Sequence, residues 1–313
     1  MRLPRFPRTV IAVALATVTL VACGGASDEG GGAGETSRTV VVGSAPFAES
    51  AILANMYAKA LEANGFKVTL KGGLGQREVY LPALERGGAN DGIDLVPEYV
   101  GTLLEFVNSN AGEASGDLDA TVTKLRARLA PKGLTVLDPS PAADQNAFAV
   151  KRSTAERLKL AKLSDLAPVA RQLTLGAGSE CPTRPFCIPG LKQTYGIEFK
   201  AFRVLDSGGP KTKDALVAGD IDVGLVFSSD GAVAARDLVV LEDDRKLQTV
   251  DNIAPAIRED VRTDAVADVL NRISAQLTTT DLVALNKRAD VDKEDPDALA
   301  EEWLRDHGLV DGK

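Results

Sequence analysis

The sequence predicts an α/β fold of two lobes with a ligand cleft between them, and three observations support this. Short β-branched runs alternate with helical stretches such as residues 50–63 and 211–218, which favours a mostly parallel sheet in each lobe. The order of these elements occurs twice along the chain. An export signal at residues 1–22 leaves 291 residues, enough for two lobes with real cores.

The internal repeat consists of matching landmarks in the same order: strand, Gly/Ser loop, helix, strand, Gly loop, helix, strand. The strands of the first pass are expected near residues 40–44, 65–70 and 92–96, and those of the second near 173–176, 199–204 and 219–223. Any α/β protein offers some coincidences of this kind, but three landmarks in one order favour duplication.

A cleft between two α/β lobes is lined by the loops that follow the carboxyl ends of the strands. The repeat therefore indicates which loops approach the ligand. They are residues 43–50, 71–78, 97–102, 176–181, 206–210 and 227–231.

The N-terminus has the pattern of a secretory signal. Three arginines precede an uncharged run of 14 residues, 9–22, which is too short to span a bilayer. The run Leu20-Val-Ala-Cys23 also resembles a bacterial lipobox. We therefore expect Cys23 to carry a lipid. The alternative is a plain signal peptide followed by an incidental cysteine.

The segment after Cys23 is built almost wholly from Gly, Ser, Ala and acidic residues. Such a composition cannot bury a core, so residues 23–38 are expected to be a lipidated flexible tether. No later apolar run approaches the length of a spanning helix. These features predict an exported protein, lipid-anchored on the extracytoplasmic face of the cell membrane, with the lipid as its only membrane contact.

The charge balance argues against a nucleic-acid partner. The chain has 36 Lys and Arg against 44 Asp and Glu. Removal of residues 1–22 takes three arginines and no acids, which leaves 33 against 44 and a net charge of −11. An acidic chain without a basic patch is a poor binder of a polyanion.

The usual parts of an enzyme are missing from the sequence. The one histidine, His307, lies near the C-terminus, and no G-x-S-x-G, H-E-x-x-H or Walker motif occurs. A carboxylate pair could serve a glycosidase, but no pattern brings two carboxylates together. We expect no catalysis, no cofactor and no metal site.

Cys181 and Cys187 flank a proline-rich loop. A close pair outside the cytoplasm is usually a disulfide, whereas a metal or redox site would need histidines or a C-x-x-C spacing. We expect a structural disulfide that stiffens this loop.

Three motifs carry a family resemblance: Ser44-Ala-Pro-Phe-Ala-Glu-Ser50, Pro97-Glu-Tyr-Val-Gly-Thr102 and Phe227-Ser-Ser-Asp-Gly231. With them, the chain resembles the substrate-binding proteins of ABC importers for glycine betaine, carnitine, choline and proline betaine over about residues 40–290. The resemblance implies a type II periplasmic-binding-protein-like fold that closes on its ligand. It also implies a small-molecule ligand, ABC permease and ATPase subunits as partners, and a monomeric protein.

In proteins of this fold the chain crosses between the lobes twice. The irregular segments near residues 143–146 and 250–254 are the expected crossings. Lobe one would then comprise residues 39–145 and 252–313, and lobe two residues 146–251.

The resemblance also implies the site. In the family, aromatic rings surround the quaternary ammonium group, which cannot form ordinary hydrogen bonds. The matching ring positions are Tyr99, Phe148 and Phe227, and the matching polar positions are Ser50, Glu78, Thr102 and Asn146. A further pair of aromatic positions falls on Asp251 and Asn252, and Asn252 is expected beside the ligand.

With these polar residues at aromatic positions, the sequence is compatible with more than one class of ligand. A quaternary ammonium solute is favoured, and the alternatives are a neutral or hydroxylated small molecule, or a surface receptor that senses ligand without transport. Phe148 and Phe227 lie in apolar strands and could instead belong to the core. Arg77 could hold a ligand carboxylate, but an arginine in such a loop is more often a surface residue.

Overall fold

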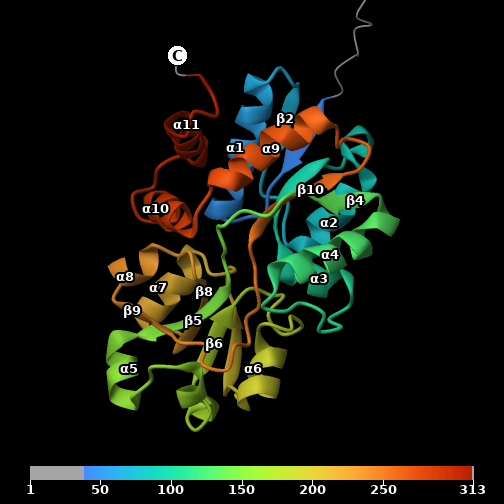
Figure 1. Ribbon diagram of the computed structural model, residues 1–313. Helices are drawn as coiled ribbons and strands as arrows, with labels where there is room; N and C mark the ends of the chain where they lie inside the picture. Colours follow the sequence, from blue (N-terminus) through green and yellow to red (C-terminus); the bar gives the residue numbers. More distant parts are fainter. Residues whose placement is uncertain (1–38, 312–313) are drawn as a thin grey trace, which may run out of the picture. The chain divides into compact units, whose positions relative to one another are not determined.

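The computed structural model describes residues 39–311, which form two five-stranded sheets with helices packed on them (Figure 1). We call the part built on the first sheet lobe one and the part built on the second sheet lobe two. Lobe one contains β1 (Val40–Gly43), α1 (Ala48–Ala63), β2 (Val68–Lys71), α2 (Arg77–Arg86), β3 (Leu95–Tyr99), α3 (Val100–Val107), α4 (Leu118–Leu129), β4 (Leu134–Val136), β10 (Ile253–Arg258), α9 (Asp264–Gln276), α10 (Thr279–Asp290) and α11 (Pro296–Asp306). Lobe two contains β5 (Asn146–Lys151), α5 (Arg152–Leu158), β6 (Thr174–Ala177), α6 (Ile188–Tyr195), β7 (Ala201–Val204), α7 (Pro210–Ala218), β8 (Val223–Phe227), α8 (Ala232–Ala235) and β9 (Leu238–Leu241).

The two sheets have the same topology. Their strand orders are β2-β1-β3-β10-β4 and β7-β6-β8-β5-β9. In each, the first three strands are parallel, and the last two pairings are antiparallel. The expectation of mostly parallel sheets is therefore corrected to mixed sheets, because β5 and β10 enter their sheets from the other lobe and run against the neighbouring strand.

One contact repeats in both lobes. A carboxylate oxygen of Asp94, just before β3, accepts a hydrogen bond of 3.0 Å from the backbone of Val41 in β1. Asp222, just before β8, accepts one of 2.9 Å from Thr174 in β6. The two aspartates lie in the last landmark of each pass, so the match between the passes extends from strand order to individual side chains.

The segments that join the lobes run side by side. Ala143 and Asn252 form an antiparallel bridge, and the Asp144 backbone N–H donates to the Asp251 carbonyl over 3.1 Å. β5 starts at Asn146 and β10 at Ile253, directly after these paired residues. The two crossing segments thus pair with each other in one short antiparallel ladder.

Each sheet is covered on both faces. The apolar run of β1 is buried at every position, as expected of a central strand between two layers of helices. Lobe one has separate core clusters around α1 with α9–α11 and around α2–α4, and lobe two has its main cluster around β5, β6 and α6. Among residues 39–311, no helix combines the length and the apolarity needed to cross a bilayer.

Candidate ligand-binding site

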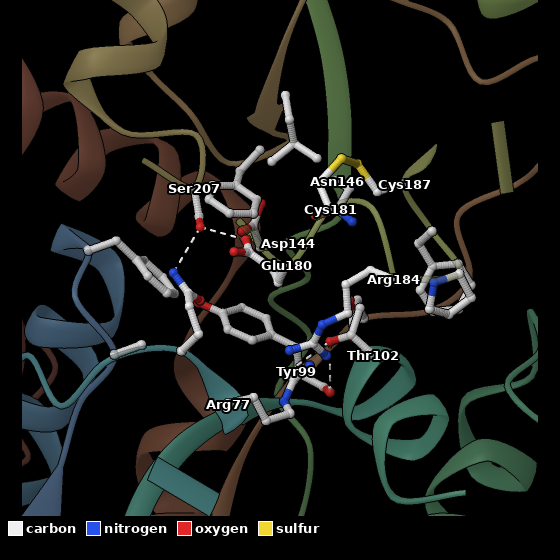
Figure 2. Close-up of a pocket in the computed structure, with 18 of the residues that line it drawn as sticks. Arg77, Tyr99, Thr102, Asp144, Asn146, Glu180, Cys181, Arg184, Cys187 and Ser207 are labelled. Atoms are coloured by element: carbon white, nitrogen blue, oxygen red, sulfur yellow. Dashed lines mark hydrogen bonds between the residues drawn. A yellow bond between two sulfur atoms is a disulfide. The ribbon is translucent and has the colours of Figure 1, made fainter. Parts of the chain in front are cut away.

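A cavity of about 110 Å³ lies between the lobes, where β1 and β3 of lobe one and β6 and β8 of lobe two end (Figure 2). Both lobes contribute to its lining. Each of the six loops that the repeat indicated supplies at least one lining residue. The cavity is therefore placed by the backbone topology, and the loop side chains determine its chemistry.

Three rings form what we call the aromatic wall: Phe47 from the loop after β1, Tyr99 at the end of β3 and Phe227 at the end of β8. The ring centroids of Phe47 and Tyr99 are 6.4 Å apart, and those of Phe47 and Phe227 are 5.8 Å apart. Tyr99 donates its hydroxyl to Glu49 Oε1 over 2.6 Å, which fixes the ring. Ring faces in a confined cavity attract a cation.

Arg77 lines the cavity and is only 7% exposed, so its interpretation as a surface residue is wrong. The guanidinium donates to both oxygens of the buried Glu98, over 2.8 and 2.6 Å, and to Thr102 Oγ1 over 3.0 Å. Tyr80 adds a hydrogen bond of 2.8 Å to the same carboxylate. A bidentate pair of this kind compensates the buried charge of Arg77 within the protein.

Arg184 approaches the cavity from lobe two, and Figure 2 shows it beside Tyr99 and Thr102. Its Nη2 donates to Glu78 Oε1 of lobe one over 3.0 Å, and its guanidinium lies 4.8 Å from the ring centroid of Phe106. Its Nε is buried without a hydrogen-bond partner among the described residues. Burial, with a smaller contribution from Arg77, lowers the pKa of Arg184 from its ordinary value. Arg184 therefore has an unused donor at the cavity.

Three carboxyl groups also line the cavity: Asp144, Glu180 and Asp251. Asp251 accepts hydrogen bonds of 2.9 and 3.0 Å from the backbone of Gly101 and Thr102, and burial raises its pKa to about 7. Burial, together with the neighbouring Glu49, raises the pKa of Asp144 well above its ordinary value. Asp144 and Asp251 are therefore groups that a bound cation would favour in their ionised form.

Glu180 belongs to a chain of hydrogen bonds that joins the lobes, drawn as dashed lines in Figure 2. Gln76 of lobe one donates to Ser207 over 2.9 Å, and Ser207 donates to Glu180 Oε1 over 2.6 Å. The other oxygen, Oε2, is buried and has no partner among the described residues. Glu180 thus presents an unused acceptor, as Arg184 presents an unused donor.

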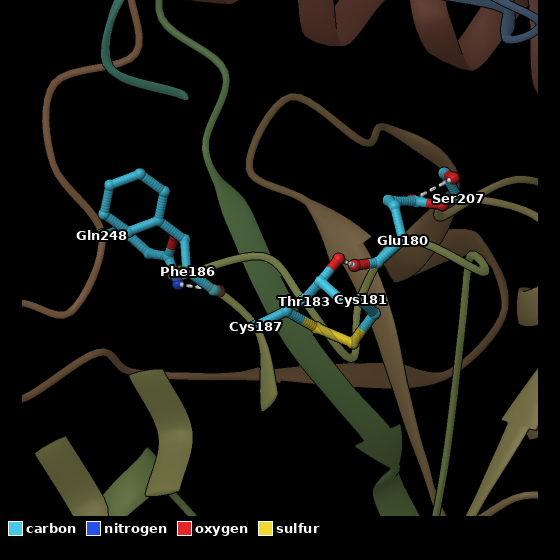
Figure 3. Close-up of a disulfide and its surroundings, with 7 residues drawn as sticks. All are labelled: Glu180, Cys181, Thr183, Phe186, Cys187, Ser207 and Gln248. Carbon is cyan, nitrogen blue, oxygen red and sulfur yellow. Dashed lines mark hydrogen bonds between the residues drawn. A yellow bond between two sulfur atoms is a disulfide. The ribbon is translucent and has the colours of Figure 1, made fainter. Parts of the chain in front are cut away.

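A disulfide joins Cys181 and Cys187, as the sequence predicted (Figure 3). The loop that it closes carries Arg184 and Phe186 to the cavity, and Glu180 directly precedes it. The Phe186 carbonyl accepts a hydrogen bond of 3.0 Å from Gln248. The bridge therefore does more than stiffen a surface loop, because it holds part of the cavity lining.

Half of the ligand-contact positions implied by the family resemblance line this cavity, namely Tyr99, Thr102, Asn146 and Phe227. The others lie elsewhere. Ser50 is 1% exposed and accepts from the Ala45 backbone over 2.9 Å. Asn252 donates to the Ser140 carbonyl over 2.9 Å. Glu78 is an exposed residue that pairs with Arg184.

Phe148 is 1% exposed and belongs to the core of lobe two, which matches the alternative interpretation of this residue. It is the third residue of β5, whereas Phe227 is the last residue of β8. A ring in the middle of a covered strand packs against the helices, and a ring at the carboxyl end reaches the cleft.

Sequence reasoning did not single out Phe47, Gln76, Glu180 or Arg184 as site residues. All four lie in or beside loops expected at the cleft, so their position gave a signal. The side chains themselves gave no such signal. A phenylalanine that follows a proline is common at any surface, and so is a charged residue in a loop.

Residues 38–306 match the family described as the substrate-binding domain of ABC-type glycine betaine transport systems. The chain belongs to this family. It is 30% identical over 307 residues to the glycine-betaine-binding protein of Pseudomonas aeruginosa, covering 93% of this chain and 94% of the relative. It is 26% identical over 285 residues to the glycine betaine-binding protein YehZ of Escherichia coli, covering 88% and 92%.

Solved structures agree with this family assignment. A crystal structure described as that of a glycine betaine/carnitine/choline ABC transporter matches with a TM-score of 0.67 and 27% identity, over 87% of this chain and all of that one. Apo YehZ matches with a TM-score of 0.61 and 27% identity, over 87% and 99%. The type II periplasmic-binding-protein-like fold is thereby confirmed. This member of the glycine betaine transport family is a substrate-binding component and not an enzyme.

Proposed function

We propose that this substrate-binding protein captures a quaternary ammonium solute, such as glycine betaine, choline, carnitine or proline betaine, outside the cytoplasm and delivers it to an ABC permease. The aromatic wall of Phe47, Tyr99 and Phe227 is the observation that carries the proposal. A permanent cation gains about 2 kcal/mol from a desolvated ring face, and the carboxyl groups of Asp144, Glu180 and Asp251 line the same cavity.

The charged lining suggests an orientation for a ligand that also has a carboxylate. Arg77 is already compensated by Glu98, whereas Arg184 has a buried N–H without a partner within residues 39–311. A carboxylate beside Arg184 and Thr102 would satisfy that donor, with the ammonium group against the aromatic wall. Buried donors of charged groups gain more than neutral ones from such a partner.

A second candidate is a hydroxylated ligand, with or without a cationic group. Glu180 Oε2 supports it, because a buried carboxyl oxygen with no partner in the part of the chain that the structure describes favours a ligand that offers a hydroxyl or N–H donor. The sensory receptor remains as an alternative role for the same site. Permease and ATPase genes beside this one would favour import.

We further propose that the protein is monomeric and lipid-anchored, and that residues 23–38 are a tether that lets both lobes reach the permease. Lobe one would comprise residues 39–145 and 252–313, and lobe two residues 146–251. Cys23 and the signal at 1–22 lie outside the described residues. The Cys23→Ser variant should be released into the medium or remain unprocessed. Membrane retention of the processed variant would contradict the anchor.

The ligand is tested by calorimetric titration of the purified protein with the four quaternary solutes and with neutral polyols as controls. Saturable binding of at least one quaternary solute, with no binding of the polyols, is expected. Binding of a polyol alone would favour the hydroxylated candidate and overturn the proposed one.

A further inference from the structure

Glu49, in the first turn of α1, lies where both lobes meet and is only 4% exposed. Its Oε1 accepts the Tyr99 hydroxyl over 2.6 Å. Its Oε2 accepts the Ser229 hydroxyl and the Asn286 side-chain N–H, each over 2.6 Å. Tyr99 is a ring of the ligand cavity, Ser229 follows β8 of lobe two, and Asn286 lies on α10. One carboxylate therefore connects the cavity with the contact between the lobes.

A hydrogen bond and an ion pair near Glu49 connect α10 to lobe two. Asn286 also donates to the Ser229 carbonyl over 3.2 Å, and Figure 1 shows α10 beside α8. At the end of α10, Asp290 pairs over 2.8 Å with Lys213 of α7, a lysine only 1% exposed. The titratable groups that act on Glu49 are Tyr99, Asp144 and Asp230.

A carboxylate suits this junction because it only accepts hydrogen bonds, and three donors converge on it. A glutamine would turn an N–H toward one of these donors. A buried charge is tolerated only while its donors remain in place. Loss of the donor on Oε1 is therefore expected to weaken the contacts on Oε2, because the carboxylate then shifts or takes up a proton.

We propose that Glu49 is a positioning residue that couples the orientation of the Tyr99 ring to the contact between the lobes. Ser229 completes the donor set only when lobe two lies against α1, and the completed set holds Tyr99 in the aromatic wall. The proposal rests on one part of the proposed function, namely that a solute binds beside Tyr99.

The test is a double-mutant cycle read by hydrogen exchange at the backbone amide of residue 229, without any solute. That amide donates over 2.9 Å to Asp144 of the crossing segment before β5, so its exchange reports local opening of the loop that carries Ser229 to Glu49. Tyr99→Phe keeps the ring and removes the hydroxyl. It should speed exchange at residue 229 roughly tenfold in the parent protein and have no further effect in Glu49→Gln.

Glu62→Gln is the matched control, because Glu62 is an exposed residue of the same helix. It should leave both the exchange and the Tyr99→Phe effect unchanged. If Glu49→Gln fails to fold, Ser229→Ala supplies the second background, with the same expected loss of coupling. An unchanged exchange in Tyr99→Phe, or an equal acceleration in both backgrounds, would overturn the proposal. Since no solute is used, a failed titration of quaternary solutes leaves this test intact.

Discussion

The rings of Phe47 in lobe one and Phe227 in lobe two lie with their centroids 5.8 Å apart, so the aromatic wall is built from both lobes. A ligand that contacts both rings gains its full attraction only while the lobes are together. Affinity for the ligand and closure of the lobes are thereby expected to be linked in one equilibrium.

Phe47→Leu tests the aromatic wall. Leucine keeps an apolar side chain but has no π face, so affinity for the quaternary solute that binds in the titration should fall roughly tenfold. Phe148→Leu is the matched control, because Phe148 lies in the core of lobe two. It should lower the free energy of unfolding by about 1 kcal/mol and leave the dissociation constant unchanged. Unchanged affinity in Phe47→Leu together with weaker binding in Phe148→Leu would show that the ligand binds elsewhere.

Arg184→Gln tests the orientation of the ligand. The variant loses the positive charge of Arg184 and its Nε–H, which is buried without a partner among the described residues. Affinity for glycine betaine should fall about tenfold or more, because a charged hydrogen bond is lost, whereas affinity for choline, which has no carboxylate, should hold or rise. Competition binding with the two solutes measures the ratio of the affinity for glycine betaine to the affinity for choline. Equal losses for both would show that Arg184 does not select for a carboxylate.

Asp251→Asn tests the buried carboxyl through the pH dependence of stability. Burial raises the pKa of Asp251 to about 7, so the folded state holds a proton that the unfolded state releases near pH 4. The protein should therefore lose stability as pH rises from about 4 to about 7, by up to about 4 kcal/mol through this residue. Chemical denaturation across this range should show a flatter profile in Asp251→Asn. An unchanged slope would contradict the raised pKa.

The double variant Cys181→Ser, Cys187→Ser tests the disulfide loop. Loss of a bridge that closes a short loop should lower the free energy of unfolding by about 2 kcal/mol. Affinity should also fall, since the loop carries Arg184 and Phe186 to the cavity. Measurements below the unfolding transition separate the two effects. Loss of stability with unchanged affinity would restrict the bridge to a structural role.

The sequence predicted the backbone of the site better than its side chains. Each of the six loops that the strand pattern and the internal repeat identified lines the cavity, because the carboxyl ends of the strands meet at the cleft. Within those loops, the family resemblance pointed to Tyr99 and Phe227, which both end a strand and line the cavity. The resemblance also implied Phe148, which lies instead in the core of lobe two, because it is in the middle of β5 and not at the end of a strand.

The remaining site residues depend on contacts between distant segments. Arg77 is buried because Glu98 and Tyr80 come together around it, and Arg184 reaches the cavity because the disulfide folds its loop inward. The antiparallel strands β5 and β10 likewise follow from the crossings between lobes. Local patterns do not report such long-range pairings.

The most direct test of the account compares glycine betaine with 3,3-dimethylbutanoate, which has the same shape and carboxylate but a neutral carbon in place of the ammonium nitrogen. Calorimetric titration of the purified protein with both compounds isolates the contribution of the positive charge. If the aromatic wall recognises a cation, glycine betaine should bind at least roughly thirtyfold more tightly, since a desolvated cation–π contact contributes about 2 kcal/mol. Equal affinities, or tighter binding of the neutral analogue, would contradict the account.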